Sequence, residues 1–580
     1  MLLRSSAVVI RRSVVALVLS VLVGVTAIAQ TTPAWAVESW TTPVDLSATG
    51  QNADEPQIVA GPNNTLTAIW YRFDGSRYIV QTSSSTDGGA TWSSVVDLSA
   101  TGQNGLNPQI VAAPNNTLTA IWRRYDGSRY IVQTRSSTDG GATWSSVVDL
   151  SATGQHADQP QIVAAPNNTL TAIWRRYDGS RYIVQTSSST DGGATWSSVV
   201  DLSATGQNAY QPQIAAAPNN TLTAIWRRND GSNNIIQTRS STDGGATWSS
   251  VVDLSATGQN AYNAQIVAAP NNTLTAIWGR SDGSNEIIQT RSSTDGGATW
   301  SSVVDLSATG QHAYNPQIAA APNNTLTAIW RRDDGSNGII QTRTSTDAGA
   351  TWSSVVDLSA TGGVVADEPQ IVAAPNNTLT AIWYRNDGSN DIIQTRSSTD
   401  GGATWSSVVD LSATGQSARA PQIVAAPNNT LTAIWRRNDG SNNIIQSSSL
   451  APSSSSSSST SSDPGVPGIF LTVAGPVGRS ASEAPVYYGA DRVAVTSTYL
   501  LTVTGVSNIA PTITTLAEGT INANGSFSSM TRLTALTPGV YNVKMVGTHT
   551  NGSTLQLTSQ ITIGGAGEFT SIGANIPVIR

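Results

Sequence analysis

Cysteine is absent from this 580-residue chain, and histidine, phenylalanine and charge are scarce. Without cysteine no disulfide framework can form, so the fold must be stabilised by packing. Three histidines, His156, His312 and His549, are scattered without the spacing of a zinc site, and we expect neither a metal nor another cofactor. Charged residues make up 12% of the chain, and 30 basic residues stand against 37 acidic ones, a balance that excludes a strongly basic nucleic-acid binder.

Tryptophan, by contrast, is abundant, with 17 residues against 4 phenylalanines, and it recurs at a period of 52 residues with a single step of 53. Such a period indicates a repeat architecture. The first series comprises Trp40, Trp92, Trp144, Trp196, Trp248, Trp300, Trp352 and Trp405. The second comprises Trp70, Trp122, Trp174, Trp226, Trp278, Trp330, Trp383 and Trp435.

One repeat, residues 109–150, contains four short runs rich in β-branched or aromatic residues: QIVAAP, TLTAIWRR, YIVQTRSS and WSSVVDL. Turn residues separate them, which predicts four antiparallel strands, as in a propeller blade. The array begins with a fourth run alone (SWTTPVDL) and ends with three runs that lack a fourth. We therefore predict an all-β, eight-bladed β-propeller in which the N-terminal strand completes the last blade, because ring closure removes exposed sheet edges.

The composition divides the remaining chain. Residues 1–36 resemble a secretory signal, with arginines at 4, 11 and 12, an apolar stretch and an Ala-Trp-Ala cleavage site. The propeller is expected over 37–450, followed by a serine-rich linker over 451–464. Alternating strand patterns over 465–565 predict an immunoglobulin-like sandwich, and 566–580 form a tail. We expect a monomer without a membrane anchor after signal cleavage, secreted from a bacterium or loosely held at its surface.

A short motif, S-x-D-x-G-x-T-W, occurs in seven copies between the third and fourth runs of the repeats. It resembles the Asp-box of the bacterial sialidase (BNR) family, and the resemblance implies a propeller in which the box lies on a turn away from the catalytic pocket. The local chemistry agrees with a structural role, because a carboxylate can accept hydrogen bonds within its own turn while glycine permits positive φ. The aspartates concerned are Asp87, Asp139, Asp191, Asp243, Asp295, Asp347 and Asp400.

The same resemblance implies what a catalytic member would contain: an arginine cluster, a tyrosine nucleophile activated by a glutamate, an acid/base aspartate and an Arg-Ile-Pro motif. Here the corresponding stretch reads EPQIVAGP, without arginine, and glutamate within the array is limited to Glu55, Glu286 and Glu368. The repeats are also nearly identical, whereas a single active site needs different residues from different blades. No catalytic residue can be assigned from this pattern.

Differences between the repeats are concentrated in the loops between blades and in the hairpins between second and third strands, which lie on one face of the ring. On this variable face an arginine follows each second-strand tryptophan by two positions, as a candidate ligand for carboxylates or sulfates. The alternative is that each pairs with the hairpin aspartate of its own blade, as Arg124 with Asp126. The eight are Arg72, Arg124, Arg176, Arg228, Arg280, Arg332, Arg385 and Arg437.

Three successive inter-blade segments carry tyrosines, Tyr210, Tyr262 and Tyr314, whose rings either stack on sugars or simply pack the loops. The first hypothesis is therefore a secreted, non-enzymatic recognition protein that binds glycans or a cell surface multivalently. The second is a sialidase-like glycoside hydrolase with a divergent site. The third is a structural spacer or envelope component.

Overall fold

The computed structural model describes residues 40–451, apart from 334, 336 and 361–364, and beyond them the backbone of nine strands between residues 468 and 578. The predicted signal at 1–36 and the serine-rich linker from 452 onward lie outside the described residues. The chain divides into two compact units, residues 1–454 and 455–580. No helix of the described part is long and apolar enough to cross a membrane.

Eight four-stranded antiparallel sheets form the first unit, and each sheet is one blade. The first strands are β2 (Ala53–Ala60), β6 (Gly105–Ala112), β10 (Ala157–Ala164), β14 (Ala209–Ala216), β18 (Ala261–Ala268), β22 (Ala313–Ala320), β26 (Ala366–Ala373) and β30 (Ala418–Ala425). The second strands are β3 (Leu66–Phe73), β7 (Leu118–Tyr125), β11 (Leu170–Tyr177), β15 (Leu222–Asn229), β19 (Leu274–Ser281), β23 (Leu326–Asp333), β27 (Leu379–Asn386) and β31 (Leu431–Asn438).

The two remaining strands of each blade differ in length. The third strands are β4 (Tyr78–Ser85), β8 (Tyr130–Ser137), β12 (Tyr182–Ser189), β16 (Asn234–Ser241), β20 (Glu286–Ser293), β24 (Gly338–Ser345), β28 (Asp391–Ser398) and β32 (Asn443–Leu450). The fourth strands have two residues each: β5 (Val96–Asp97), β9 (Val148–Asp149), β13 (Val200–Asp201), β17 (Val252–Asp253), β21 (Val304–Asp305), β25 (Val356–Asp357), β29 (Val409–Asp410) and β1 (Val44–Asp45).

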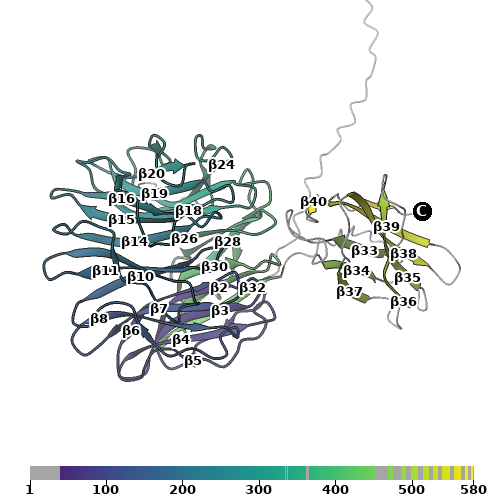
Figure 1. The fold of residues 1–580 in the computed structure, drawn as a ribbon, viewed down its shortest axis with the longest axis horizontal. Coiled ribbons are helices and arrows are strands. Elements are labelled where there is room, and N and C mark those ends of the chain that lie inside the picture. The colour runs from purple at the N-terminus through teal and green to yellow at the C-terminus, as the bar shows by residue number, and fades with distance from the viewer. Residues whose placement is uncertain are drawn as a thin grey trace, which may run out of the picture. The chain divides into compact units, whose positions relative to one another are not determined.

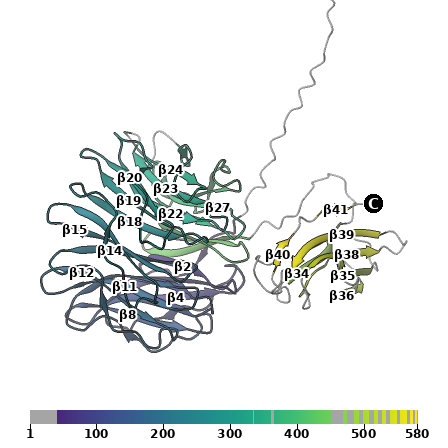
Figure 2. The ribbon, with the colours of Figure 1, turned by 45° about the horizontal axis from the view of Figure 1, so that its top comes forward.

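The ring closes as the incomplete terminal repeats predicted. Strand β1 pairs antiparallel with β32, with Val44 opposite Ser447 and Asp45 opposite Gln446. The first strands of neighbouring blades contact one another around the axis, and β2 of the first blade contacts β30 of the last. Figure 1 shows the purple first blade beside the green last blade, and Figure 2 shows the successive blades fanning from purple to green.

Packing between blades is built on the second-strand tryptophans, all eight of which are 0% exposed. Trp278, for example, packs against Ile225, Ile236 and Leu254 of the preceding blade. Because side chains alternate along a strand, the residue that follows each tryptophan points to the other side of its sheet, toward the next blade. The tryptophan therefore contacts the preceding blade, and the residue after it contacts the next blade.

The fourth strands are shorter than the predicted WSSVVDL run. The tryptophan at its start belongs to the Asp-box turn, where the Trp144 indole N–H donates to the carbonyl of Gly141 at 3.1 Å. In the box of Asp295, the carboxylate accepts the Thr299 N–H at 2.9 Å and the Ser293 hydroxyl at 2.8 Å. The turn thus satisfies its own polar groups before the strand begins.

The Asn-Asn turns between first and second strands form a continuous hydrogen-bonded ring on the face that carries the Asp-boxes. In each turn the second asparagine adopts positive φ, such as 66° at Asn116, which asparagine tolerates better than most residues. Its side-chain oxygen accepts the N–H of the first asparagine of the preceding blade, as from Asn63 to Asn116 at 3.0 Å. The last link, from Asn428 to Asn64 at 2.8 Å, closes the circle.

The second unit contains two antiparallel sheets. One contains β33 (Gly468–Val473), β34 (Pro485–Asp491) and β37 (Phe527–Arg532). The other contains β35 (Thr498–Val506), β36 (Thr514–Thr520), β38 (Gly539–Thr548), β39 (Thr554–Ile563), β40 (Phe569–Ile572) and β41 (Ile576–Val578). The all-β architecture of this unit matches the expectation, and its assignment as immunoglobulin-like stays a prediction.

Candidate functional site

The eight arginines predicted as ligands lie near the ends of the second strands, on the same side as the buried tryptophans. Most of them donate to the glutamine of the loop that precedes their own blade: Arg124 to Gln103, Arg176 to Gln155, Arg280 to Gln259, Arg332 to Gln311 and Arg437 to Gln416. Arg72 instead donates to Gln81 at 3.0 Å. The five guanidiniums bonded to loop glutamines tie the loops between blades to the second strands, whereas Arg72 ties its second strand to the third.

Among the hairpin aspartates that the structure describes, none forms an ion pair with the arginine of this series in its own blade. The Asp126 carboxylate accepts the backbone N–H groups of Ser128 and Arg129, at 2.8 and 2.7 Å, inside its own turn. These bonds lower the pKa of Asp126, as do the equivalent bonds in the other hairpins. The Asp126 carboxylate therefore stabilises its own turn, and Arg124 donates to Gln103 instead.

A second arginine series was missed by the sequence analysis. The residue directly after each second-strand tryptophan faces the next blade, and it varies around the ring: Tyr71, Arg123, Arg175, Arg227, Gly279, Arg331, Tyr384 and Arg436. The signal was available in the sequence, because this position differs between blades while the following arginine does not. Variation of the side chain at a structurally equivalent position is what an asymmetric site requires.

On one side of the ring, carboxylates neutralise these arginines. Arg331 contacts Asp367 of the next blade at 2.6 Å and Asp333 at 3.0 Å, and Arg436 contacts Asp54 of the first blade at 2.5 Å. Through Asp367 and Asp333 the pKa of Arg331 is raised despite its burial. This part of the variable face is therefore internally paired, and these arginines cannot engage an anion without losing a carboxylate.

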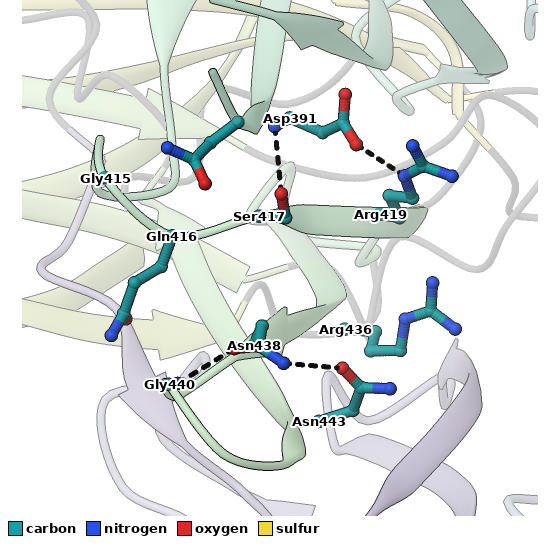
Figure 3. Close-up of a pocket in the computed structure, with 10 residues that line it drawn as sticks. Asp391, Gly415, Gln416, Ser417, Arg419, Arg436, Asn438, Gly440 and Asn443 are labelled. Atoms are coloured by element: carbon teal, nitrogen blue, oxygen red, sulfur yellow. Dashed lines mark hydrogen bonds and ion pairs between the residues drawn. The ribbon is translucent and has the colours of Figure 1, made fainter.

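A cavity of about 490 Å³ lies between the last two blades in the same internally paired region. Figure 3 shows Arg419 reaching Asp391 across it, with the Arg419 Nε 2.5 Å from the Asp391 carboxylate. The Ser417 hydroxyl accepts the Asp391 N–H, and the Asn438 amide donates to Asn443. A further cavity, of about 380 Å³, is lined by His312, Arg331 and Asp333. Every arginine that lines these two cavities, Arg419 and Arg436 in the first and Arg331 in the second, is already paired with a carboxylate.

On the other side of the ring, the arginines stack on aromatic rings. We call the following set the aromatic arc: Arg123, Tyr130, His156, Arg175, Tyr182, Tyr210, Arg227 and Tyr262. Ring centroids lie 5.6 Å apart between Tyr130 and His156, 6.1 Å between His156 and Tyr182, and 5.8 Å between Tyr182 and Tyr210. The arc therefore runs without interruption from the second blade to the fifth.

Arginines stack on the rings of the arc. The Arg123 guanidinium lies 4.6 Å from the Tyr130 centroid, and that of Arg175 lies 4.5 Å from Tyr182. Both arginines also contact Asp158, each at 3.0 Å, and burial lowers the pKa of the adjacent His156 despite the attraction of Asp158. Two guanidiniums therefore share the Asp158 carboxylate here.

Arg227 differs from the other arginines of its series. Its guanidinium lies between Tyr210 and Tyr262, 5.0 and 5.9 Å from their ring centroids. Among the described residues it forms no ion pair and no hydrogen bond, and burial lowers its pKa. The Nε of this half-buried cation is buried without a partner, and the four N–H groups of its two terminal nitrogens remain for a ligand.

The three predicted tyrosines lie in strands and not in loops. Tyr210, Tyr262 and Tyr314 are the second residues of β14, β18 and β22. The structure brings the first two together around Arg227, whereas Tyr314 stacks on His312 at 5.4 Å and lies 5.6 Å from Arg331. The sequence analysis assigned these tyrosines to loops because it began the first strands at the QIVA run. The strands in fact begin about four residues earlier.

Two further tyrosines lie beside carboxylates on the variable face. Burial, with Asp54 and Glu55 nearby, raises the pKa of Tyr71, and burial with Asp367 nearby raises the pKa of Tyr384 to about 12. Both phenols are therefore protonated near neutral pH. No group of three or more potential metal ligands occurs in the described part of the chain.

Comparison with known proteins agrees with this architecture. Residues 272–462 match the family model of the BNR repeat-like domain, and the described part of this segment belongs to the eight-bladed ring. No curated protein matches the sequence.

Among solved structures, the chain is similar to a leech intramolecular trans-sialidase, at 12% identity over 68% of this chain and 95% of that one, with a TM-score of 0.33. It is similar to NanB sialidase of Streptococcus pneumoniae at 11% identity over 71% and 97%, with a TM-score of 0.35. It is also similar to an α-L-arabinanase of Penicillium chrysogenum at 17% identity over 51% and 93%, with a TM-score of 0.33.

Proposed function

We propose that this chain is an exported, non-enzymatic recognition protein whose aromatic arc binds glycans that carry carboxylates or sulfates. The observation that carries the proposal is Arg227, a half-buried guanidinium between two tyrosine rings with no carboxylate to neutralise it. Guanidinium groups recognise planar anions through two parallel hydrogen bonds, and tyrosine faces pack against sugar rings. The arc offers both over several neighbouring blades, which suits an extended saccharide.

The arc also sharpens the multivalent hypothesis. Eight equivalent weak sites would require equivalent blades, yet the arginines two positions after each tryptophan mostly bond to loop glutamines. The proposal therefore places recognition on Arg123, Arg175 and Arg227, with Tyr210 and Tyr262 retained from the sequence-based prediction. Neighbouring units of one glycan would contact neighbouring blades.

The full exported chain on an array of carboxylated, sulfated and neutral oligosaccharides tests the proposal. Replacement of Arg227 with alanine should weaken binding of the acidic glycans about tenfold or more, as expected when a charge-assisted contact of about 1.5–3 kcal/mol is lost. Arg181→Ala is the matched control, because it removes the same charge from an exposed hairpin of the same face. Binding lost in Arg228→Ala but kept in Arg227→Ala would instead favour the first arginine series.

Hydrolase activity is the main alternative, and the match to the BNR repeat-like domain is consistent with it. A sialidase-like mechanism needs a tyrosine beside a carboxylate that accepts its proton, and Tyr71, with Asp54 and Glu55 nearby, is the phenol to test. A fluorogenic sialoside assay separates the two functions. Turnover that Tyr71→Phe abolishes would overturn the non-enzymatic proposal.

A further inference from the structure

A separate cavity of about 480 Å³ lies on the axis of the ring, where the first strands of the second to seventh blades meet. Its lining repeats one pattern from blade to blade: a polar residue, then usually proline, then glutamine, as in Gln159, Pro160 and Gln161. The volume falls within the range of small-molecule sites, about 300–1,000 Å³. None of the residues of the aromatic arc lines it.

The lining residues reach the axis through a bulge in every first strand. In β10, pairing with β11 is interrupted between Asp158 and Gln161, and the residue inside the bulge, Gln159, adopts a φ of 53°. The equivalent residues include Glu55 at 51° and Ala420 at 53°, side chains that rarely take this conformation. Bulges re-aim side chains, and backbone strain of this kind is concentrated at ligand sites.

Contacts between blades hold the bulges in place. The Gln211 N–H donates to the Gln159 side-chain oxygen at 2.8 Å, and the Ala420 N–H donates to the Glu368 carboxylate at 2.8 Å. The ring of neighbouring first strands therefore determines the strained geometry, and the cavity is preformed. The bulges lie toward the strand starts, so the cavity is nearer to the variable face than to the Asn-Asn ring.

Three of the glutamines that end these lining segments leave their side-chain amides unused. Gln161, Gln213 and Gln265 form no side-chain hydrogen bond with any described residue, and their polar atoms are not buried. The side-chain oxygen of Gln211 is buried without a partner. Each primary amide offers two donors and one acceptor, which matches hydroxyl groups that both donate and accept.

The charge of the residues that line the axial cavity disfavours an anionic ligand. The lining contains one carboxylate, Glu368, and no cationic side chain. An anion would therefore be repelled and would find no counter-ion, while the proline rings of the lining provide apolar surface for C–H groups. We propose that the axial cavity binds a neutral saccharide unit of one or two rings, held by the amides of Gln161, Gln213 and Gln265.

Binding of D-glucose, D-galactose, D-mannose, N-acetylglucosamine, lactose and cellobiose to the full chain tests this proposal by saturation-transfer NMR and calorimetry. At least one sugar should bind saturably, and Gln161→Met/Gln213→Met should weaken it at least tenfold, because methionine keeps the shape and removes the amide. Gln57→Met/Gln422→Met is the matched control: these glutamines occupy the same strand position in blades that do not line the cavity.

Thermal unfolding verifies that each variant is folded, and the single variant Gln213→Met replaces the double variant if the latter is unstable. Arg227→Ala should leave neutral-sugar binding unchanged, so failure of the acidic-glycan proposal is distinguishable from failure of this one. If none of the six sugars binds, the axial site is wrong. It is also wrong if Gln161→Met/Gln213→Met leaves the affinity unchanged while Gln57→Met/Gln422→Met lowers it.

Discussion

Ala348 is the one residue of the Asp-box turns that departs from the repeated glycine, and its backbone shows the consequence. It adopts a φ of 61°, where the other boxes have glycine at values such as 74° at Gly296. A side chain in this region costs about 1 kcal/mol relative to glycine. The second glycine of the box has a different requirement, because a Cβ on Gly297 would lie 2.3 Å from the Ser240 hydroxyl oxygen.

These geometries predict an order of stabilities. Ala348→Gly should raise the free energy of unfolding by about 1 kcal/mol, and Gly296→Ala should lower it by a similar amount. Gly297→Ala should lower it further, because the added methyl group must displace the Ser240 side chain of the preceding blade. Urea unfolding of the three variants beside the unchanged chain measures the order. Equal costs for the two glycine variants would show that φ alone matters.

At the scale of one element, the Asp-box turn couples stability to pH. Hydrogen bonds from the Thr299 hydroxyl and N–H, and then from the Ser293 hydroxyl, hold the pKa of Asp295 at about 2. Five more boxes have the same value, and the pKa of Asp400 is also lowered. Because the folded pKa lies below that of the unfolded chain, about 3.9, the contribution is complete above about pH 5 and is lost as pH falls toward 2.

Asp295→Asn provides the measurement. It should lower stability at pH 7, where the carboxylate bonds are fully formed, and the difference from the unchanged chain should shrink between pH 4 and pH 2. Unfolding in urea at several pH values measures the loss of stability at pH 7 and its decrease at low pH. A constant difference across this range would mean that the carboxylate charge makes no contribution and that turn geometry alone matters.

The sequence predicted the elements of the ring better than the site. Tryptophan spacing and the two incomplete terminal repeats are global signals that any closed array must satisfy, so blade number and closure were accessible. Arg123 and Arg124 point to opposite sides of their strand because side chains alternate. The sequence analysis selected the arginine present in every blade, Arg124 and its equivalents, and missed the variable position before it. The bulges were beyond prediction, because Glu55, Gln159 and Ala420 belong to residue types that do not favour positive φ.

At the scale of the whole molecule, stability depends on the strand that joins the two ends of the array. Leu46, 6% exposed, packs with Trp70 of the first blade and Ile445 of the last, while Trp40 packs against the cluster of Tyr384 and Trp435. The N-terminal segment thus contacts the cores on both sides of the last blade. Without it, the β32 edge would be open to solvent and to other chains.

A chain that begins at residue 49 should therefore unfold at a clearly lower temperature than one that begins at residue 37, and it should self-associate. Loss of the Leu46 and Trp40 contacts predicts a cost of about 4 kcal/mol or more. Thermal unfolding and size-exclusion chromatography measure the two effects. If the shorter chain stays monomeric and equally stable, closure rests instead on the first-strand contacts and on the asparagine ring, whose last link joins Asn428 to Asn64. Asn64→Gly, which keeps positive φ and removes that link, would then become the destabilising change.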